Sequence, residues 1–167
     1  MAGETVIIRS YQDILNLLAR DGILHQADPP DLSVRIPTAR GAVEGLMLLR
    51  WQERDGVMQL IHPLPLRARA DRLSEVEGAI LRLNHALALP GFGLDHGSGQ
   101  LYYRATLPVV PDGVTDRTVQ SVFRAVVRSV YDLLPALRRV VEEGASAEGV
   151  VADASVDLAL GASPAQN

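Results

Sequence analysis

The chain has 167 residues, enough for one domain with a substantial core and short for two, and its 47% hydrophobic and 22% charged residues are typical of globular proteins. It has no cysteine and no apolar run near the ~20 residues of a membrane span, which excludes disulfides, thiolate metal sites, a cysteine nucleophile and a spanning helix. All 16 basic residues are arginine, and 15 acids accompany them in residues 1–141, a balance that argues against nonspecific nucleic-acid binding.

The first predicted element is a helix that begins after Ser10, whose hydroxyl can accept the free amide of Asp13. Gly22 provides the stop. The segment 28–31, Asp-Pro-Pro-Asp, then predicts a loop, because it cannot continue a helix. The apolar stripe of the helix consists of Ile14, Leu15, Leu17 and Leu18.

A short strand is expected next, since Leu32, Val34 and Ile36 alternate with polar residues. Pro37 either ends this strand or marks it as an edge strand, because proline has no amide donor for the ladder.

Two further strands, Val43–Arg54 and Val57–Leu64, are joined by Asp55–Gly56, a strong hairpin signal. A two-residue turn would place Arg54 opposite Val57. The same register sets Leu49 opposite His62, Trp51 opposite Leu60, and Glu53 opposite Met58.

The predicted hairpin has apolar residues on both faces. A slip of one residue would exchange the two faces. The expected core face contains Val43, Met47, Leu49, Trp51, Met58, Leu60 and Leu64. The other face carries Leu46, Leu48, Val57 and Ile61 among Arg50, Gln52 and Gln59, too apolar for a plain solvated surface.

The middle of the chain predicts a helix over Ser74–Leu89, with Ser74 and Glu77 as a capping box. Pro90–Gly91 stops it, and two strands follow at Phe92–Asp95 and Gln100–Val109 around a glycine-rich turn. The apolar stripe of this helix is Val76, Ile80, Leu83 and Leu87.

The last predicted helix covers Asp116–Glu143, capped by Thr115 and kinked at Pro135. Residues 144–167 are rich in alanine, glycine and acids, and we expect a flexible tail that folding does not require. Val150, Val151, Ala154 and Leu158 could share one side of a short helix there. The expected organisation is therefore a domain at 1–143 and a tail at 144–167.

The elements sum to the order α-β-β-β-α-β-β-α, an α+β fold with a five-stranded antiparallel sheet packed against helices. This order resembles type III secretion chaperones and, more closely, the YbjN family that shares their fold. The resemblance is carried by Leu83-Asn84, the segment 90–95 (PGFGLD), the segment 100–104 (QLYYR), Leu107-Pro108 and the late Pro135. It implies a non-enzymatic, commonly dimeric protein, and secretion chaperones hold an extended stretch of a client on apolar surface.

No pattern in the sequence predicts chemistry. The histidines, His25, His62, His85 and His96, lack ligand spacing, and no G-x-S-x-G elbow is present. The most suggestive polar feature is an arginine strip on the last helix, formed by Arg117, Arg124, Arg128, Arg138 and Arg139. The simplest interpretation is the solvated back of the helix; the alternative is a docking strip for an acidic partner, the chain's own acidic tail or a nucleic-acid backbone.

We therefore predict a protein-binding module of chaperone or adaptor type, acting as a homodimer on an unidentified client, with no cofactor and no metal. A cytoplasmic location is expected, because no secretory signal is evident in the sequence. The alternative is a nucleic-acid-associated regulator using the arginine strip, although the charge balance disfavours direct binding. The expected partner or dimer surface is Leu46, Leu48, Val57 and Ile61 of the hairpin with Val76, Ile80, Leu83 and Leu87 of the middle helix.

Overall fold

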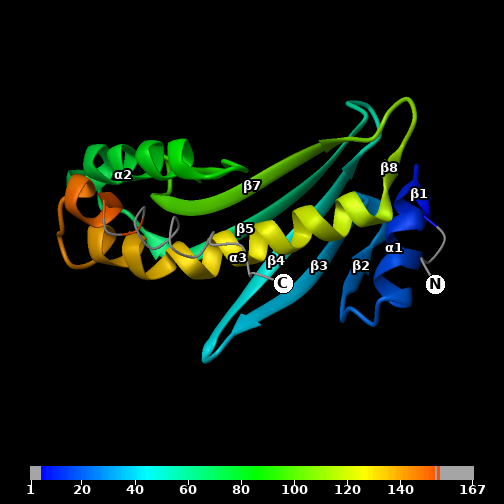
Figure 1. Ribbon diagram of the computed structural model, residues 1–167, viewed down its shortest axis with the longest axis horizontal. Helices are drawn as coiled ribbons and strands as arrows, with labels where there is room; N and C mark the ends of the chain where they lie inside the picture. The colour runs from blue at the N-terminus through cyan, green and yellow to red at the C-terminus, as the bar shows by residue number, and fades with distance from the viewer. Residues whose placement is uncertain (1–4, 153, 155–167) are drawn as a thin grey trace, which may run out of the picture. The chain divides into compact units, whose positions relative to one another are not determined.

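The chain folds into two compact units (Figure 1). The structure, a computed structural model, describes residues 5–152 and 154. Unit 1 comprises Met1–Pro63 with Tyr103–Ser129, and unit 2 comprises Leu64–Tyr102 with Val130–Asn167. Strands β5 (Val57–Arg67) and β7 (Gln100–Pro108) and helix α3 (Asp116–Val141) contribute residues to both units.

The α+β class is confirmed, but the expected count of five strands is wrong. One sheet has six strands in the order β2-β3-β4-β5-β7-β6, and β1 pairs with β8 in a separate two-stranded sheet. Strands β1, β2 and β8 were not predicted, because runs of two or three residues are too short to show alternation. The remaining elements of unit 1 are β1 (Ile7–Ile8), α1 (Tyr11–Arg20), β2 (Gln26–Asp28), a 3-10 turn (Pro29–Asp31), β3 (Ser33–Arg40), β4 (Val43–Gln52) and β8 (Val114–Thr115).

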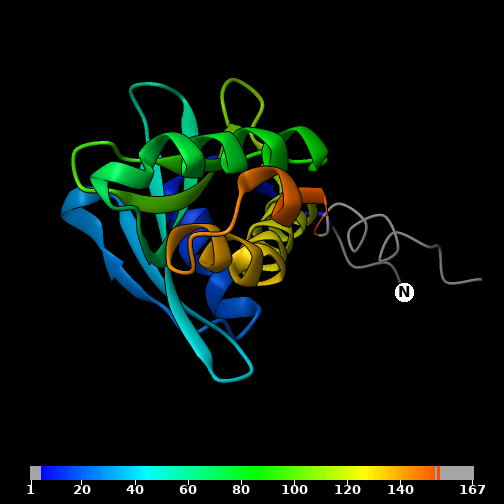
Figure 2. The same cartoon turned by 90° about the vertical axis from the view of Figure 1, so that its left-hand side faces the viewer.

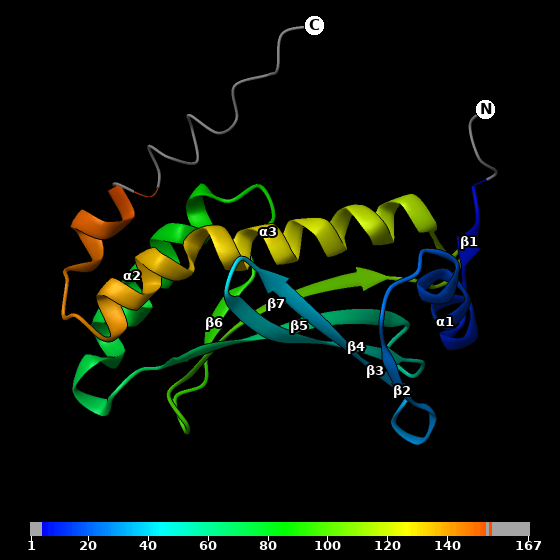
Figure 3. The ribbon, with the colours of Figure 1, turned by 90° about the horizontal axis from the view of Figure 1, so that it is seen from below.

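Unit 1 is a layered structure whose strands carry a helix on one face. In Figure 3 the unit 1 part of α3 runs along this face, and no described helix of the unit covers the other face. The predicted cap of α1 is confirmed, since the Ser10 hydroxyl accepts the Asp13 amide at 3.2 Å. The core is built from side chains at most 1% exposed, including Ile14, Val34, Ile36, Met47, Leu49, Met58, Leu60 and Val126.

The first strand that the sequence predicts, β3, is longer than expected. β3 runs through Pro37 to Arg40, so the edge alternative for this proline is correct. β2 pairs only with Ser33–Arg35, and therefore one side of β3 has no neighbouring described strand at Pro37. A missing amide donor is tolerated at such a position.

The hairpin register differs from the prediction by two residues. Leu49 lies opposite Leu60 and Trp51 opposite Met58, because the turn spans four residues, with the Gly56 amide bonded to the Glu53 carbonyl at 3.2 Å. A shift of two residues keeps every side chain on its predicted face. The core-side residues Leu49, Trp51, Met58 and Leu60 are 0–6% exposed, which confirms the face assignment.

Unit 2 contains α2, the end of α3 and the last described helix of the chain (Figure 2). Its elements are the rest of β5, a 3-10 turn (Ala70–Arg72), α2 (Leu73–Ala86), β6 (Phe92–Leu94), the first residues of β7, the end of α3 and a helix that includes residues 147–152 and 154. The Arg72 guanidinium donates to the carbonyls of Val140 and Ala145 at 3.0 Å each. The Glu75 carboxylate accepts the Ala147 amide at 2.6 Å, and so α2 and its 3-10 turn hold the last described helix.

The capping box predicted at Ser74 and Glu77 is absent. The 3-10 turn leads directly into α2, whose N-cap is Arg72 with no side-chain cap bond, so Ser74 already lies inside the helix. Glu77 instead lies 2.6 Å from His96. The helix ends at Ala86, three residues before the predicted end.

Candidate functional site

The face of unit 1 that α3 does not cover carries a cluster of apolar side chains. We call it the outer face and define its apolar part as Leu46, Leu48, Val57 and Ile61. Leu46 is 46% exposed, and the other three are half-buried. Leu48 lies directly opposite Ile61 on β5, and Leu46 lies opposite Pro37 on β3. Pro37 of β3, Leu46 and Leu48 of β4 and Ile61 of β5 thus form one continuous apolar surface, whereas Val57 lies beyond Gln59 on the same face.

Arginines surround this apolar surface. Arg35 lies opposite Leu48, Arg50 is two residues further along β4, and both are exposed. Arg104 on β7 shares the face, because Thr106, two residues on, contacts Gln59 at 3.4 Å. Strand pairing adds two acids to this face, Glu44 on β4 and Asp28 on β2, which lies opposite Ser33 and so in line with Arg50. The outer face is therefore apolar at its centre, with three arginines and two acids around it.

The middle-helix stripe does not form a surface of this kind. Val76, Ile80 and Leu83 are 0%, 7% and 1% exposed, and Leu87 is half-buried. The sequence predicts that these residues face a partner, but Val76, Ile80 and Leu83 are packed inside the folded chain. The exposed apolar residue of α2 is Leu81, at 73%.

The arginine strip is divided between the two units. Arg117, Arg124 and Arg128 belong to unit 1 and are exposed, while Arg138 and Arg139 belong to unit 2. Arg138 pairs with Glu142 at 3.4 Å, one turn later on the chain. The strip consequently offers three exposed cations in unit 1.

The histidines have separate local roles. His62 is 1% exposed; its Nδ1 donates to the Pro63 carbonyl at 3.0 Å and its Nε2 contacts the Thr38 hydroxyl at 2.8 Å. Burial lowers the pKa of His62, against a smaller opposing effect of hydrogen bonds to the backbone of Pro63 and of His62 itself. In the described residues, no three His, Asp or Glu side chains are grouped to hold a metal ion.

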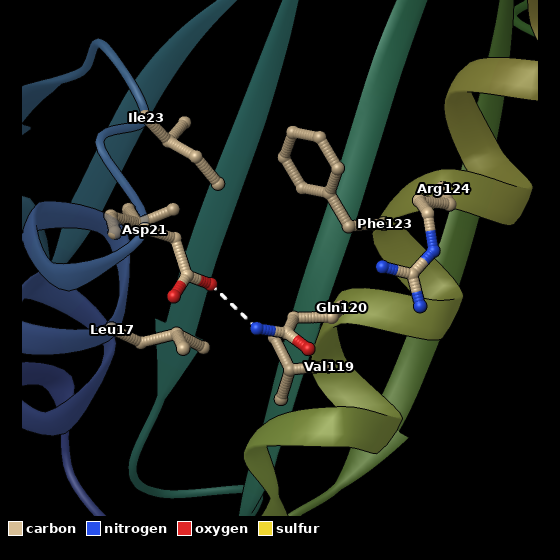
Figure 4. Close-up of a pocket in the computed structure, with 8 residues that line it drawn as sticks. Leu17, Asp21, Ile23, Val119, Gln120, Phe123 and Arg124 are labelled. Carbon is tan, nitrogen blue, oxygen red and sulfur yellow. Dashed lines mark hydrogen bonds between the residues drawn. The ribbon is translucent and has the colours of Figure 1, made fainter. Parts of the chain in front are cut away.

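Unit 1 has a cavity between α1 and α3 that no sequence pattern predicts (Figure 4). It has a volume of about 310 Å³. Its polar residues are Asp21, Gln120 and Arg124, and the Gln120 amide donates to the Asp21 carboxylate at 2.6 Å across it. Its apolar lining is Leu17, Leu18, Ile23, Val119 and Phe123. The lining residues from positions 17–23 and those from positions 119–124 are about a hundred positions apart in sequence, so no local motif predicts the site.

These features define an α+β protein with an uncovered apolar sheet face and a small cavity beneath its long helix. The model of the YbjN family, described as "Putative bacterial sensory transduction regulator", matches residues 11–139, and the chain belongs to this family. The family is thus described as a regulator and not by an enzymatic activity.

A solved structure supports the same fold. The structure titled "Crystal structure of YbjN, a putative transcription regulator from E. coli" superposes with a TM-score of 0.57 at 9% identity, covering 78% of this chain and 95% of that one. At this identity the similarity shows the fold alone. No curated protein matches the sequence. None of the helices in the described residues is long and apolar enough to cross a membrane.

Proposed function

We propose that the chain is a non-enzymatic regulator that works by binding a partner protein on the outer face of unit 1. The observation that carries this proposal is the continuous apolar surface of Leu46, Leu48 and Ile61, which no described helix of the unit covers. Contiguous exposed apolar patches on soluble proteins commonly mark interaction sites. The family's description as a regulator supports the same class of function.

The charges of the outer face indicate what kind of partner fits. Arg35, Arg50 and Arg104 lie around the apolar centre together with two acids, Glu44 and Asp28, which leaves an excess of one positive charge. A partner segment with apolar side chains flanked by acids would bury the centre and pair with the arginines. The chain resembles a chaperone or adaptor in this respect, since such proteins hold client segments on apolar surface.

The expected homodimer remains a prediction. If two copies stacked this face on itself about a two-fold axis, the arginines of both copies would be brought together, which is unfavourable. We therefore expect any homodimer to use another surface. Light scattering over a range of concentrations tests it, and a constant monomer mass would contradict it.

Site-specific photo-cross-linking in the native cell tests the partner surface. A photoreactive residue in place of Leu48 should give adducts with one or a few proteins. The matched control is Leu81, an exposed leucine of unit 2 that does not lie on this face. Arg50→Glu should abolish the adducts at position 48. Equal adducts at both positions, or adducts unaffected by Arg50→Glu, would contradict the proposal.

A second candidate is a nucleic-acid-associated regulator. Arg117, Arg124 and Arg128 are exposed on one helix, and the similar E. coli protein is described as "a putative transcription regulator". Three phosphate contacts would give a slope of about −3 in log affinity against log salt concentration. Titration of a labelled DNA duplex measures this slope, and Arg128→Gln should reduce it by about 1. Binding without that salt dependence would exclude phosphate contacts by these arginines.

A further inference from the structure

The cavity between α1 and α3 is built like a small-molecule site. Its volume of about 310 Å³ lies at the lower end of the range for ligand pockets. Leu17, Leu18 and Val119 form the interior wall, each at most 5% exposed. Ile23 and Phe123 are half-buried beside them. A wall of this composition favours an apolar body of about ten non-hydrogen atoms, at about 30 Å³ per water-sized group.

The carboxylate of Asp21 is already compensated. Its Oδ1 accepts Nε of Arg20 at 3.0 Å, and its Oδ2 accepts the Gln120 amide at 2.6 Å. The Gln120 hydrogen bond is the main cause that lowers the pKa of Asp21, so this carboxylate is ionised at neutral pH. With both oxygens occupied, Asp21 braces α1 against α3 and has little capacity left for a ligand cation.

A second acid near this network, Asp116, is also accounted for. Arg20 donates to it at 2.9 Å, and the Arg117 amide donates to it at 2.8 Å. Asp116 is the first residue of α3, where the helix dipole favours a negative charge. Its charge is therefore balanced without any group inside the cavity.

Arg124 is the polar residue of the lining whose charge is not balanced in this way. Within the described part of the chain, its hydrogen bonding is limited to the Ser121 hydroxyl at 3.4 Å, and no carboxylate pairs with it. In Figure 4 its guanidinium lies beside Phe123 and Gln120. An arginine in this position can bind a carboxylate in bidentate fashion with strong, charge-assisted hydrogen bonds.

We propose that this cavity binds a small amphipathic anion whose apolar body occupies the space between Leu17, Val119 and Phe123 and whose carboxylate pairs with Arg124. The site is independent of the outer face, since α3 runs along the opposite face of the strands. The chain would then join a ligand site to a partner surface within one unit. A failure of ligand binding would leave the proposed partner binding unaffected.

Three probes of equal chain length test the charge preference: octanoate, octanol and octylammonium, each of about ten non-hydrogen atoms. Each is titrated into the isotope-labelled full chain and followed by the amide resonances. Octanoate should bind with a dissociation constant in the millimolar range or tighter, and amides at Leu18, Asp21, Val119 and Phe123 should shift. Octanol should bind more weakly, and octylammonium most weakly.

Two arginine variants assign the anion to its partner. Arg124→Gln should weaken octanoate binding at least about tenfold and leave octanol binding unchanged, because one charge-assisted contact is removed. Arg128→Gln is the matched control, since it removes the same charge one turn further along α3, outside the cavity lining. Arg128→Gln should change octanoate binding less than about twofold.

Four outcomes would overturn the proposal. Equal binding of the three probes would show a nonspecific apolar crevice. Octanoate shifts elsewhere in the chain, or equal effects of Arg124→Gln and Arg128→Gln, would place the anion outside the cavity. Finally, if octanoate fails to bind while an acidic peptide with a bulky apolar side chain shifts the same amides, that result would show that the cavity binds a protein segment and not a small anion.

Discussion

Asn84 holds the connection between α2 and β6, and its replacement offers a quantitative test of unit 2. Its side-chain oxygen accepts the amides of Gly91 and Phe92 at 3.1 and 2.9 Å, and its amide group donates to the Phe92 carbonyl at 2.8 Å. One half-buried side chain thus replaces backbone hydrogen bonds that the irregular segment after the helix cannot make by itself.

Asn84→Ala removes all three hydrogen bonds. At about 1 kcal/mol each, the loss is about 3 kcal/mol. The better helix propensity of alanine offsets about 0.5 kcal/mol, and water can reach this partly buried site. We expect the free energy of unfolding to fall by about 2 kcal/mol and the melting temperature by about 5 °C.

Urea denaturation followed by circular dichroism measures this change, with Trp51 fluorescence as a second probe, located in unit 1. His85→Ala is the matched control, because His85 is the next residue of α2 and is exposed. It should change stability by less than about 0.5 kcal/mol. If Asn84→Ala is as mild as His85→Ala, the three hydrogen bonds do not fix the connection and the reasoning is refuted.

Three other changes test separate parts of the chain. The sequence favours a tail at 144–167 that can be removed. The buried residues and hydrogen bonds of the helix at 147–152 lead us to expect instead that deletion of 144–167 lowers the melting temperature, whereas deletion of 155–167 does not. An unchanged melting temperature after deletion of 144–167 would support the sequence-based boundary. The lowered pKa of His62 means that below its ordinary pKa near 6.5 the unfolded chain takes up a proton that the folded chain does not, so stability should fall as pH falls from about 6.5 toward the folded pKa. His62→Gln should flatten this slope, measured by urea denaturation at several pH values; an unchanged slope would assign the effect to other groups. Ser10→Ala should cost about 1 kcal/mol by removing the cap of α1, and an unchanged thermal melt would show that the cap is dispensable.

Several features follow from local sequence alone. Ser10 caps its helix because the acceptor and the free amide are three residues apart. The two faces of the hairpin follow from strand alternation, and they survive an error in register because that error is two residues, one full period. The α+β class follows from the order of such elements.

The register itself depends on the turn. Asp55–Gly56 favours a two-residue turn, but the structure makes a four-residue turn that also includes Glu53 and Arg54, with Gly56 at φ +65°. The Gly56 carbonyl accepts the Val109 amide, and a Cβ on Gly56 would meet the Val110 side chain. A contact between residues more than fifty positions apart thus accompanies the turn, and local propensity cannot report it.

Burial and the cavity were decided by tertiary structure. The stripe of α2 reads as surplus apolar surface in the sequence, yet it is buried once the chain is folded. The cavity needs Asp21 from the end of α1 and Gln120 from the start of α3, joined by a hydrogen bond across 99 positions of sequence. Periodicity reports which side chains share a face of one element. It carries no information on which distant element that face will meet, because packing partners are selected by the shape and charge of the whole folded chain.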